Sequence, residues 1–431
     1  MPKVLSRRDF LARAAAGLVG CALASMGCGT QTQGGTGGGR TTLNLWYWNR
    51  SIDDNILEQV NKRFPKANLV PQKIGGDYRS KLLITFAGKS YVPDIAGINV
   101  DIATYFPDAD QFVDLQSVGA NEVKSDYLEW KWLQGITPEG KMIGFPMDIG
   151  PIALFYREDI LRKAGVPTDP DQLYERIKTW EEYFELGEFL KSKLPQRVSL
   201  ADEITQIFQH VMAQGADWYQ DKSGHFIGDQ AHVKRAWDLA VTAHRKGLLA
   251  NSARYSTDWN ASADTGRFIT FHGAVWMKLI LKDAAPDTTG LWRVCPAPGG
   301  AGNSGGSFLS ITRYCKDPQL AFDIISWVQN PENQLKAYVE IDLYPSTPSI
   351  YNRPEMNHPE EFFGGQNTNP IFSESARQVK PFYLGTEYNI INPIYAKELT
   401  NVATQGKDPE RAWEDALHEI QKRLQLRGAW K

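Results

Sequence analysis

The stretch 140–167 constrains the fold more than any other part of the chain. Two short apolar runs, 142–145 and 152–156, are rich in β-branched and aromatic residues, which is typical of strands. Between them, Pro146 and Pro151 each remove a backbone donor and favour extended geometry in the preceding residue. A run interrupted in this way indicates either a crossover between two packed bodies or a kinked strand at the edge of one sheet.

Strand-like and helix-like segments alternate near the start of the chain, at 41–48, 56–64, 67–70, 82–86 and 93–98. This alternation predicts an α/β fold with a mostly parallel sheet and helices on both faces. Ligands of such sheets bind beyond the carboxyl ends of the strands. Those ends are marked here by Trp48 and Asn49, by the loop 75–78, and by Asn99 to Asp101.

The order of several short motifs resembles family 1 extracellular solute-binding proteins, the sugar receptors of ABC importers of the maltose-binding type. The matching motifs are Gly-x-x-x-Gly-Phe-Pro (140–146), Tyr-Arg-Glu-Asp (156–159), Ala-Gly-Val-Pro (164–167), Thr-Trp-Glu-Glu (179–182) and Gly-Gly-Ser-Phe-Leu (305–309).

The resemblance implies a two-lobed, type II periplasmic-binding-protein-like fold. Each lobe would be a mostly parallel sheet flanked by helices, and three strands would cross a hinge between them. The expected N-lobe is 41–147 plus 308–342, and the expected C-lobe is 148–307 plus 343–431. The resemblance also implies a carbohydrate ligand, an importer permease as partner, and no cofactor.

The first 40 residues have the pattern of an export and anchoring segment. Arg7 and Arg8 form a twin-arginine motif, and an apolar run too short to span a bilayer follows. We expect the signal to be 1–27, with lipid on Cys28 and a flexible Gly-rich tether at 28–40. Cys21 is the alternative anchor; cleavage without lipid is the other alternative, which the tether directly after Cys28 disfavours.

Charge excludes one class of partner. Loss of 1–27 removes four basic residues and one acidic residue, so the net charge falls from −3 to −6. An acidic body without a basic cluster is not typical of a nucleic-acid-binding protein. We therefore expect an extracytoplasmic monomer that is held at the membrane by lipid alone.

Cys295 and Cys315 are the two cysteines that remain after the signal, and they flank a Gly-rich loop between two strand-like runs. Export permits disulfides, and a hairpin can give two cysteines the required geometry. We expect a disulfide here, with two buried free thiols as the alternative. The seven histidines are scattered without ligand spacing, so no metal site is expected.

Sugar binding combines an aromatic face with polar side chains that bond to the hydroxyl rim. All 13 tryptophans lie outside the signal, and several fall in or beside loops. Alone, each of these loop tryptophans could equally pack between lobes, and Asp148 could equally cap a turn. The candidate ligand-binding residues are Trp48, Asn49, Asp77, Tyr78, Asn99, Asp101, Asp148, Trp218, Trp259, Trp276, Gly306, Ser307, Tyr344 and Tyr388.

Two other function classes remain open from the residues. A secreted carbohydrate-active hydrolase would need two carboxylates about 5–5.5 Å or about 6.5–9.5 Å apart. No local motif marks Asp77 and Asp148 as such a pair. An importer receptor for a peptide or polyamine would use the same fold with a different pocket. The loop aromatics favour a sugar.

Overall fold

The structure is a computed structural model, and it describes residues 39–431. The calls on the signal, the export motif Arg7 and Arg8, the anchor cysteines Cys21 and Cys28 and most of the tether lie outside these residues. Within 39–431, no helix has the length and apolar character needed to cross a membrane.

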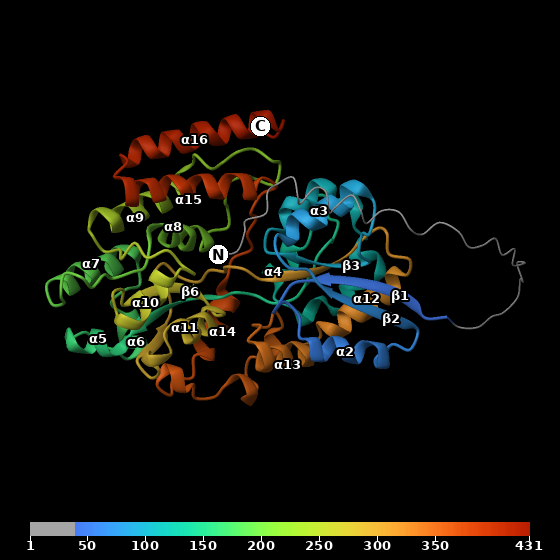
Figure 1. Ribbon diagram of the computed structural model, residues 1–431, viewed down its shortest axis with the longest axis horizontal. Helices are drawn as coiled ribbons and strands as arrows, with labels where there is room; N and C mark the ends of the chain where they lie inside the picture. Colours follow the sequence, from blue (N-terminus) through green and yellow to red (C-terminus); the bar gives the residue numbers. More distant parts are fainter. Residues whose placement is uncertain (1–38) are drawn as a thin grey trace, which may run out of the picture. The chain divides into compact units, whose positions relative to one another are not determined.

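A five-stranded sheet organises the first lobe, on the right in Figure 1. Its strands lie in the order β2 (Ala67–Lys73), β1 (Thr41–Tyr47), β3 (Ile95–Asn99), β8 (Ser307–Ile311) and β4 (Phe145–Pro146). β1 pairs in parallel with β2 and β3, whereas β8 is antiparallel to both β3 and β4. Of the expected strand at 142–145, only Phe145 lies in β4.

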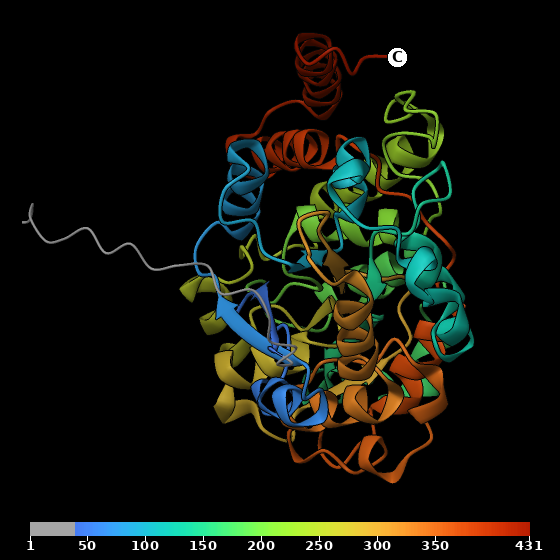
Figure 2. The same ribbon diagram turned by 90° about the vertical axis from the view of Figure 1, so that its right-hand side faces the viewer.

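Helices cover both faces of this sheet, as the alternation of segments predicts. One face packs on α2 (Asp54–Arg63) and α12 (Pro318–Val328), and the other packs on α3 (Tyr78–Gly88) and the 3₁₀ helix η1 (Ile102–Gln111). Figure 2 turns this lobe toward the viewer. The remaining elements of the lobe are α4 (Glu129–Gln134), α13 (Pro331–Ile341), η2 (Leu115–Val118) and η3 (Ala120–Asp126).

The second lobe surrounds a three-stranded sheet in the order β6 (Thr270–Ala274), β5 (Ile152–Arg157) and β7 (Trp292–Cys295). Both pairings are antiparallel, so the expectation of a mostly parallel sheet in each lobe is wrong for this one. Helical segments join the strands: the end of β5 lies beside the start of β6, whereas the connection from β6 to β7 returns to the opposite end of the sheet. The helices are α5 (Glu158–Lys163), α6 (Pro170–Tyr174), α7 (Trp180–Lys191), α8 (Ile204–Ala213), α9 (Ala231–Arg245), α10 (Thr257–Thr265), α11 (Met277–Ala284), α14 (Asn369–Gln378), α15 (Tyr388–Gln405) and α16 (Pro409–Leu426).

Short 3₁₀ turns complete the second lobe at Pro286–Thr288, Pro348–Ile350, Pro354–Met356 and Glu361–Phe363. α15 and α16 pack together at one end of the molecule in both views (Figures 1 and 2). Asp408 caps α16 by accepting from the Arg411 N–H, and Pro409 follows at the first helical position.

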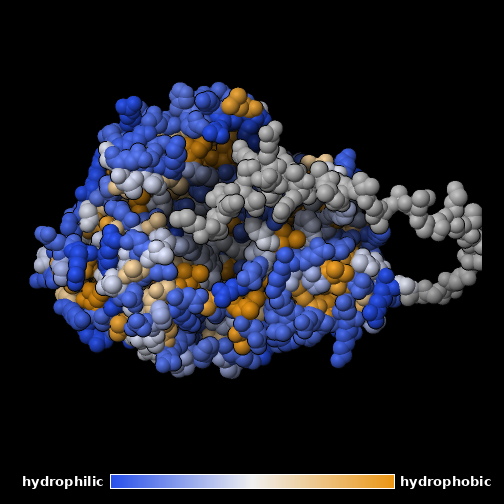
Figure 3. Space-filling model, viewed as in Figure 1, coloured by the Kyte–Doolittle hydropathy of each residue, from blue (hydrophilic) through white to orange (hydrophobic). Residues whose placement is uncertain are grey.

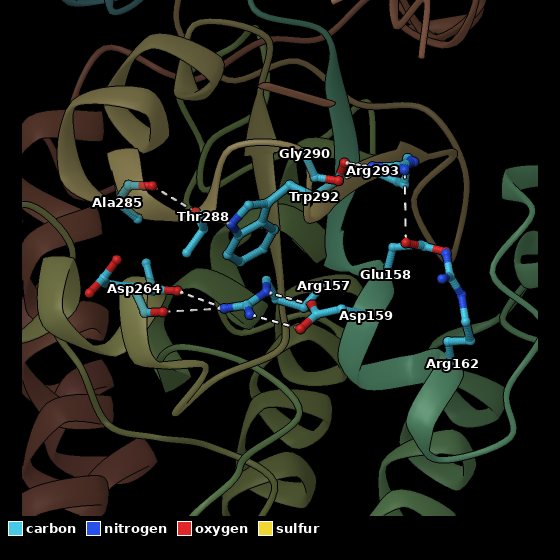
Figure 4. Close-up of polar contacts among 11 residues, drawn as sticks. Arg157, Glu158, Asp159, Arg162, Asp264, Ala285, Thr288, Gly290, Trp292 and Arg293 are labelled. Atoms are coloured by element: carbon cyan, nitrogen blue, oxygen red, sulfur yellow. Dashed lines mark hydrogen bonds and ion pairs between the residues drawn. The ribbon is translucent and has the colours of Figure 1, made fainter. Parts of the chain in front are cut away.

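The Tyr-Arg-Glu-Asp motif has a structural role at the carboxyl end of β5 (Figure 4). The buried Arg157 guanidinium donates to both carboxylate oxygens of Asp159 and to the carbonyls of Ala263 and Asp264. It also lies 5.8 Å from the Trp292 ring centroid. The motif thus connects β5, α10 and β7 at the carboxyl end of β5.

The expected disulfide is absent, because Cys295 and Cys315 are free and buried in different cores. β7 and β8 are consecutive in the chain but belong to different sheets, so they do not form the hairpin that the disulfide required. Burial raises the pKa of Cys315 to about 12 and raises the pKa of Cys295 further.

Candidate functional site

Three backbone segments join the two lobes, at 147–151, 302–307 and 343–346. They are bonded to one another: the Met147 N–H donates to the Ser307 carbonyl at 3.0 Å, and the Ser304 N–H donates to the Gly150 carbonyl at 2.8 Å. The Ile149 N–H donates to the Tyr344 carbonyl at 2.9 Å. We call this layer the hinge layer.

Two of the predicted residues, Gly306 and Ser307, lie in the hinge layer beside Asp148. Gly306 has φ +93°, and a Cβ there would lie 2.7 Å from the Asp148 carbonyl oxygen. The Ser307 N–H donates to that same carbonyl at 3.3 Å. These residues therefore hold two crossing segments in close contact.

Asp148 faces a buried lysine that the sequence reasoning missed. Lys131 of α4 is fully buried, and its Nζ lies 3.4 Å from the Phe308 ring centroid. Burial lowers the pKa of Lys131 to about 7, although the charge of Asp148 opposes the shift. Burial likewise raises the pKa of Asp148 against the effects of Lys131 and Ser307. Lys131 could not be found from the sequence, because it stands in a Trp-Lys-Trp run with no recognisable pattern.

Trp48, Tyr78 and Asp101 follow the carboxyl ends of β1, β2 and β3, as the α/β reasoning expected, and the first two of them are in contact. The Trp48 and Tyr78 rings pack edge to face at 5.2 Å, and the Tyr78 hydroxyl donates to the Trp46 carbonyl at 3.2 Å. Gly97 lies against the Trp48 ring, and a Cβ at Gly97 would be 2.9 Å from it. The indole is thus held in a fixed, partly exposed position.

Asp101 makes a contact between the lobes. Its carboxylate accepts from the Asn389 Nδ2 at the start of α15, and it lies 3.3 Å from Arg79 Nε of α3. Asn389 is 288 positions away in sequence, so this contact has no local signal. Charge-assisted hydrogen bonds of this kind are stronger than neutral ones.

Tyr388, the residue before Asn389, belongs to a cluster of aromatic side chains in the second lobe. Tyr388 packs against Trp218 at 5.5 Å and against Tyr219 at 6.1 Å. Burial, together with the charge of Asp101, raises the pKa of Tyr388. The Trp218 Nε1 is a buried donor without a hydrogen-bond partner among residues 39–431. Tyr388 therefore lies near Asp101, and Trp218 packs against Tyr388.

Trp276 follows β6 and reaches the hinge layer, since its Nε1 donates to the Ser304 carbonyl at 3.2 Å. The exposed Tyr255 ring lies nearly parallel to it, with centroids 6.4 Å apart. Tyr255 has φ +65°, a strained conformation for a bulky residue that often marks functional positions. A positive φ leaves no trace in the sequence, so Tyr255 was missed.

An acidic group lies close to Tyr255 in the second lobe. Glu203 accepts from the Arg254 N–H, and Arg254 Nε bonds to the buried Asp202 carboxylate at 2.7 Å. Burial, and then the charge of Asp202, raises the pKa of Glu203. Neither acid was among the predicted residues.

Four predicted residues have structural positions instead. Trp259 is fully buried and donates to Asp202, so it cannot form a platform in a cleft; Tyr344 is buried too and donates to Asn369. Asp77 caps α3 by accepting from the Ser80 N–H, and the Asn99 side chain bonds the Val100 N–H. Asn49 is exposed in the turn after β1, next to Trp48.

The arrangement suits binding of a neutral polar molecule. The partly exposed rings of Trp48 and Trp276 and the Asp101–Asn389 contact supply aromatic faces, a carboxylate and an amide from both lobes. On the face drawn in Figure 3, apolar side chains lie scattered among hydrophilic ones. Among residues 39–431, no group of three His, Cys, Asp or Glu side chains could hold a metal ion.

The chain is similar in sequence to proteins that are named for the saccharides they bind. The chain is 23% identical over 425 residues to an arabinooligosaccharide-binding protein of Bacillus subtilis, covering 92% of this chain and 95% of that one. It is 25% identical over 281 residues to a lactose-binding protein of Rhizobium radiobacter, covering 62% and 63% of the two chains.

Solved structures share the fold. A crystal structure of an extracellular solute-binding protein of family 1 superimposes with a TM-score of 0.85 at 28% identity, covering 88% of this chain and 99% of that one. The galacto-N-biose-/lacto-N-biose I-binding protein of Bifidobacterium longum gives a TM-score of 0.75 at 18% identity, with 90% and 98% covered. These confirm the two-lobed fold.

The family model described as bacterial extracellular solute-binding protein matches residues 57–364, which is more than half of the chain. The protein therefore belongs to the family of bacterial extracellular solute-binding proteins.

Proposed function

We propose that this protein is an extracytoplasmic receptor that captures an oligosaccharide between its lobes and delivers it to an ABC importer. The observation that carries the proposal is the Asp101–Asn389 contact. It joins the carboxyl end of β3 in the first lobe to the start of α15 in the second lobe, where Tyr388 lies near Asp101. The relatives named for arabino-oligosaccharides and lactose support a saccharide as the ligand.

The chemistry follows from the side chains. Trp48 and Trp276 offer flat apolar faces for the C–H surface of a sugar ring. Asp101 and Asn389 offer an acceptor and a donor for hydroxyl groups, and hydrogen bonds to a charged group contribute about 1.5–3 kcal/mol each. A ligand that bonds both lobes stabilises the closed arrangement, which shifts the population toward it.

The remaining features of the proposal concern the chain outside this site. We take 41–147 plus 308–342 as the N-lobe and 148–307 plus 343–431 as the C-lobe. Export through Arg7 and Arg8, a lipid on Cys28 and a monomeric state complete the proposal. The ligand is bound and released without a bond being made or broken.

The test is a thermal-shift screen against arabinose, arabinobiose, arabinotriose, arabinotetraose and lactose, with spermidine and a tripeptide as competing classes. A saccharide at 100 times its Kd should stabilise the folded protein by about 2.7 kcal/mol. Trp276→Ala should lose this shift while melting as a folded protein. Trp430→Ala, which removes a tryptophan packed on Phe226, should keep it.

A shift with spermidine or the tripeptide alone would contradict the saccharide assignment. Breakdown of any saccharide during the incubation, measured by chromatography of the sugars, would contradict the receptor function and indicate a hydrolase.

A further inference from the structure

A cavity of about 330 Å³ lies within the second lobe, between α6, α14 and the loop 296–301 that follows β7. This volume falls within the usual range for small-molecule sites. All of its lining residues belong to the second lobe, and none of the predicted ligand-binding residues is among them. The cavity is therefore complete without the first lobe.

The cavity lies at the edge of the three-stranded sheet that is away from Trp276. The strands of this sheet lie in the order β6, β5 and β7. Trp276 follows β6, whereas the loop 296–301 follows β7. A molecule in the cavity would therefore lie at the opposite sheet edge from the indole that we assign to the saccharide.

Hydrogen bonds fix the walls of the cavity. The Ser375 hydroxyl of α14 donates to the Ile152 carbonyl of β5 at 2.9 Å. On the other side, the Gln214 Nε2 of α8 donates to two carbonyls of the loop, those of Pro298 at 2.7 Å and Gly300 at 2.9 Å. A Cβ at Gly300 would meet no atom within 4 Å, so there is open space beside the loop. Small-molecule sites are usually preformed in this way.

Most of the lining is apolar, and one aromatic residue belongs to it. The apolar and aromatic lining residues are Ile152, Tyr174, Pro296, Ala297 and Ile371. Tyr174 is half-buried at the end of α6. Such a lining favours a ligand with a compact apolar body, and an aromatic ring suits it because rings pack well on one another.

The charged side chains that line the cavity are both acidic. They are Asp171 of α6 and Glu374 of α14, and no Lys, Arg or His among residues 39–431 lines the cavity. Neither carboxylate therefore has a counter-charge inside it. The charge of Asp171 adds to burial in raising the pKa of the Cys295 thiol, so this carboxylate lies close to the end of β7. The cavity thus combines an apolar lining with negative charge from two helices.

We propose that this cavity is a binding site for an arylalkylamine, a compact organic cation whose ring packs on the apolar lining and whose ammonium group faces Asp171 and Glu374. The two carboxylates attract the cation and repel an anion of the same shape. Because one lobe supplies the whole lining, the amine binds without closure of the lobes. The site is additional to the proposed saccharide site and does not depend on it.

The test compares three probes of similar shape and different charge: phenethylamine, phenethyl alcohol and 3-phenylpropionate. The double variant Asp171→Asn/Glu374→Gln removes both carboxylates at exposed positions. Glu185→Gln, at an exposed position of α7 outside the cavity, is the matched control. Dissociation constants are measured at pH 7 and constant ionic strength by ligand-detected NMR titration, with a melting curve of each protein.

The wild type and the Glu185→Gln control should bind phenethylamine at least fivefold more tightly than the alcohol, and 3-phenylpropionate should bind most weakly. In the double variant, phenethylamine binding should weaken about fivefold, as expected for the loss of two exposed charge contacts. Binding of the alcohol should stay within twofold of wild type. Trp48→Ala, which removes a ring of the saccharide site, should bind phenethylamine as the wild type does.

Equal affinity of the wild type for the three probes, or unchanged phenethylamine binding in the folded double variant, would overturn the amine site. Weaker phenethylamine binding in Trp48→Ala would overturn it too, because the amine would then lie between the lobes. Each of these outcomes leaves the proposed saccharide binding untouched, since that function uses other residues.

Discussion

Gly150 shows how closely the backbone segments of the hinge layer approach one another. A Cβ at this position would lie 1.9 Å from the Ser304 carbonyl oxygen and 3.2 Å from the Ala274 Cβ. The Gly150 N–H also donates to Asn303 Oδ1 at 2.9 Å. The absence of a side chain is therefore what allows two crossing segments to pair.

Gly150→Ala should lower the free energy of unfolding by about 1–3 kcal/mol, because the new methyl group forces the two segments apart. Gly88→Ala is the control, since Gly88 ends α3 and a Cβ there meets no atom within 4 Å. The control should be neutral or stabilising by up to about 1 kcal/mol. Urea unfolding of both variants checks this; equal stabilities would contradict the steric argument.

Single residues were predictable where a general rule placed them. Trp48 and Asp101 follow strands, and the rule about carboxyl ends of parallel strands places them at one edge of the sheet. Trp259 and Tyr344 followed no such rule: their surroundings in sequence look like loops, but distant segments bury both. Asn389 and Lys131 depend on contacts between segments far apart in the chain, which one sequence does not reveal.

At the scale of elements, α4 inserts a charged side chain into the hinge layer. Lys131 Nζ and Asp148 Oδ1 both lack hydrogen-bond partners within residues 39–431. The charge of each group offsets part of the cost of burying the other. Removal of one of the two leaves the burial of the other uncompensated, whereas replacement of both by uncharged groups is often neutral or stabilising.

Asp148→Asn should destabilise the fold by about 3–5 kcal/mol at pH 6, where the Lys131 ammonium would be left without a counter-charge. The double variant Lys131→Met/Asp148→Asn should recover this loss and reach at least wild-type stability. Chemical unfolding of the three proteins measures the cycle. A double variant as unstable as the single one would show that Asp148 acts through other groups.

The elements also show where sequence reasoning failed. The two prolines at 146–151 alone left open a crossover or a kinked edge strand, and the family resemblance implied the crossover; in the structure β4 and β5, on either side of this stretch, belong to different sheets. The disulfide prediction was wrong because strand-like runs separated by a short Gly-rich loop normally form a hairpin. Here that loop carries the chain from one lobe to the other, and a local pattern does not distinguish these outcomes.

At the scale of the whole molecule, two buried histidines in the second lobe link stability to pH. Burial, and then the charge of Arg254, lowers the pKa of His210 to about 3. Burial, followed by His210 and Arg254, lowers the pKa of His272 well below its ordinary value. Trp180 covers the His272 ring at 4.5 Å. Both rings are therefore neutral in the folded protein near neutral pH.

The unfolded chain protonates these histidines near pH 6.5, while the folded protein does so only in strong acid. The contribution of the two neutral histidines to the free energy of unfolding is therefore fully present above about pH 6.5. It decreases as the pH drops, by up to about 1.4 kcal/mol per pH unit for each histidine. His210→Gln should reduce this slope between pH 6.5 and 5.5, measured by urea unfolding. His418→Gln, at an exposed position of α16, should not; equal slopes in all forms would contradict the assignment.

The position of β8 in the five-stranded sheet has a consequence for the order of assembly. β8 lies between β3 and β4, although about 160 residues separate it from β4 in the chain. During synthesis on a ribosome, the first lobe cannot complete its sheet until the polypeptide has been elongated past Ile311. Until then, β3 has no partner at the edge that β8 will occupy, while most of the second lobe is being synthesised.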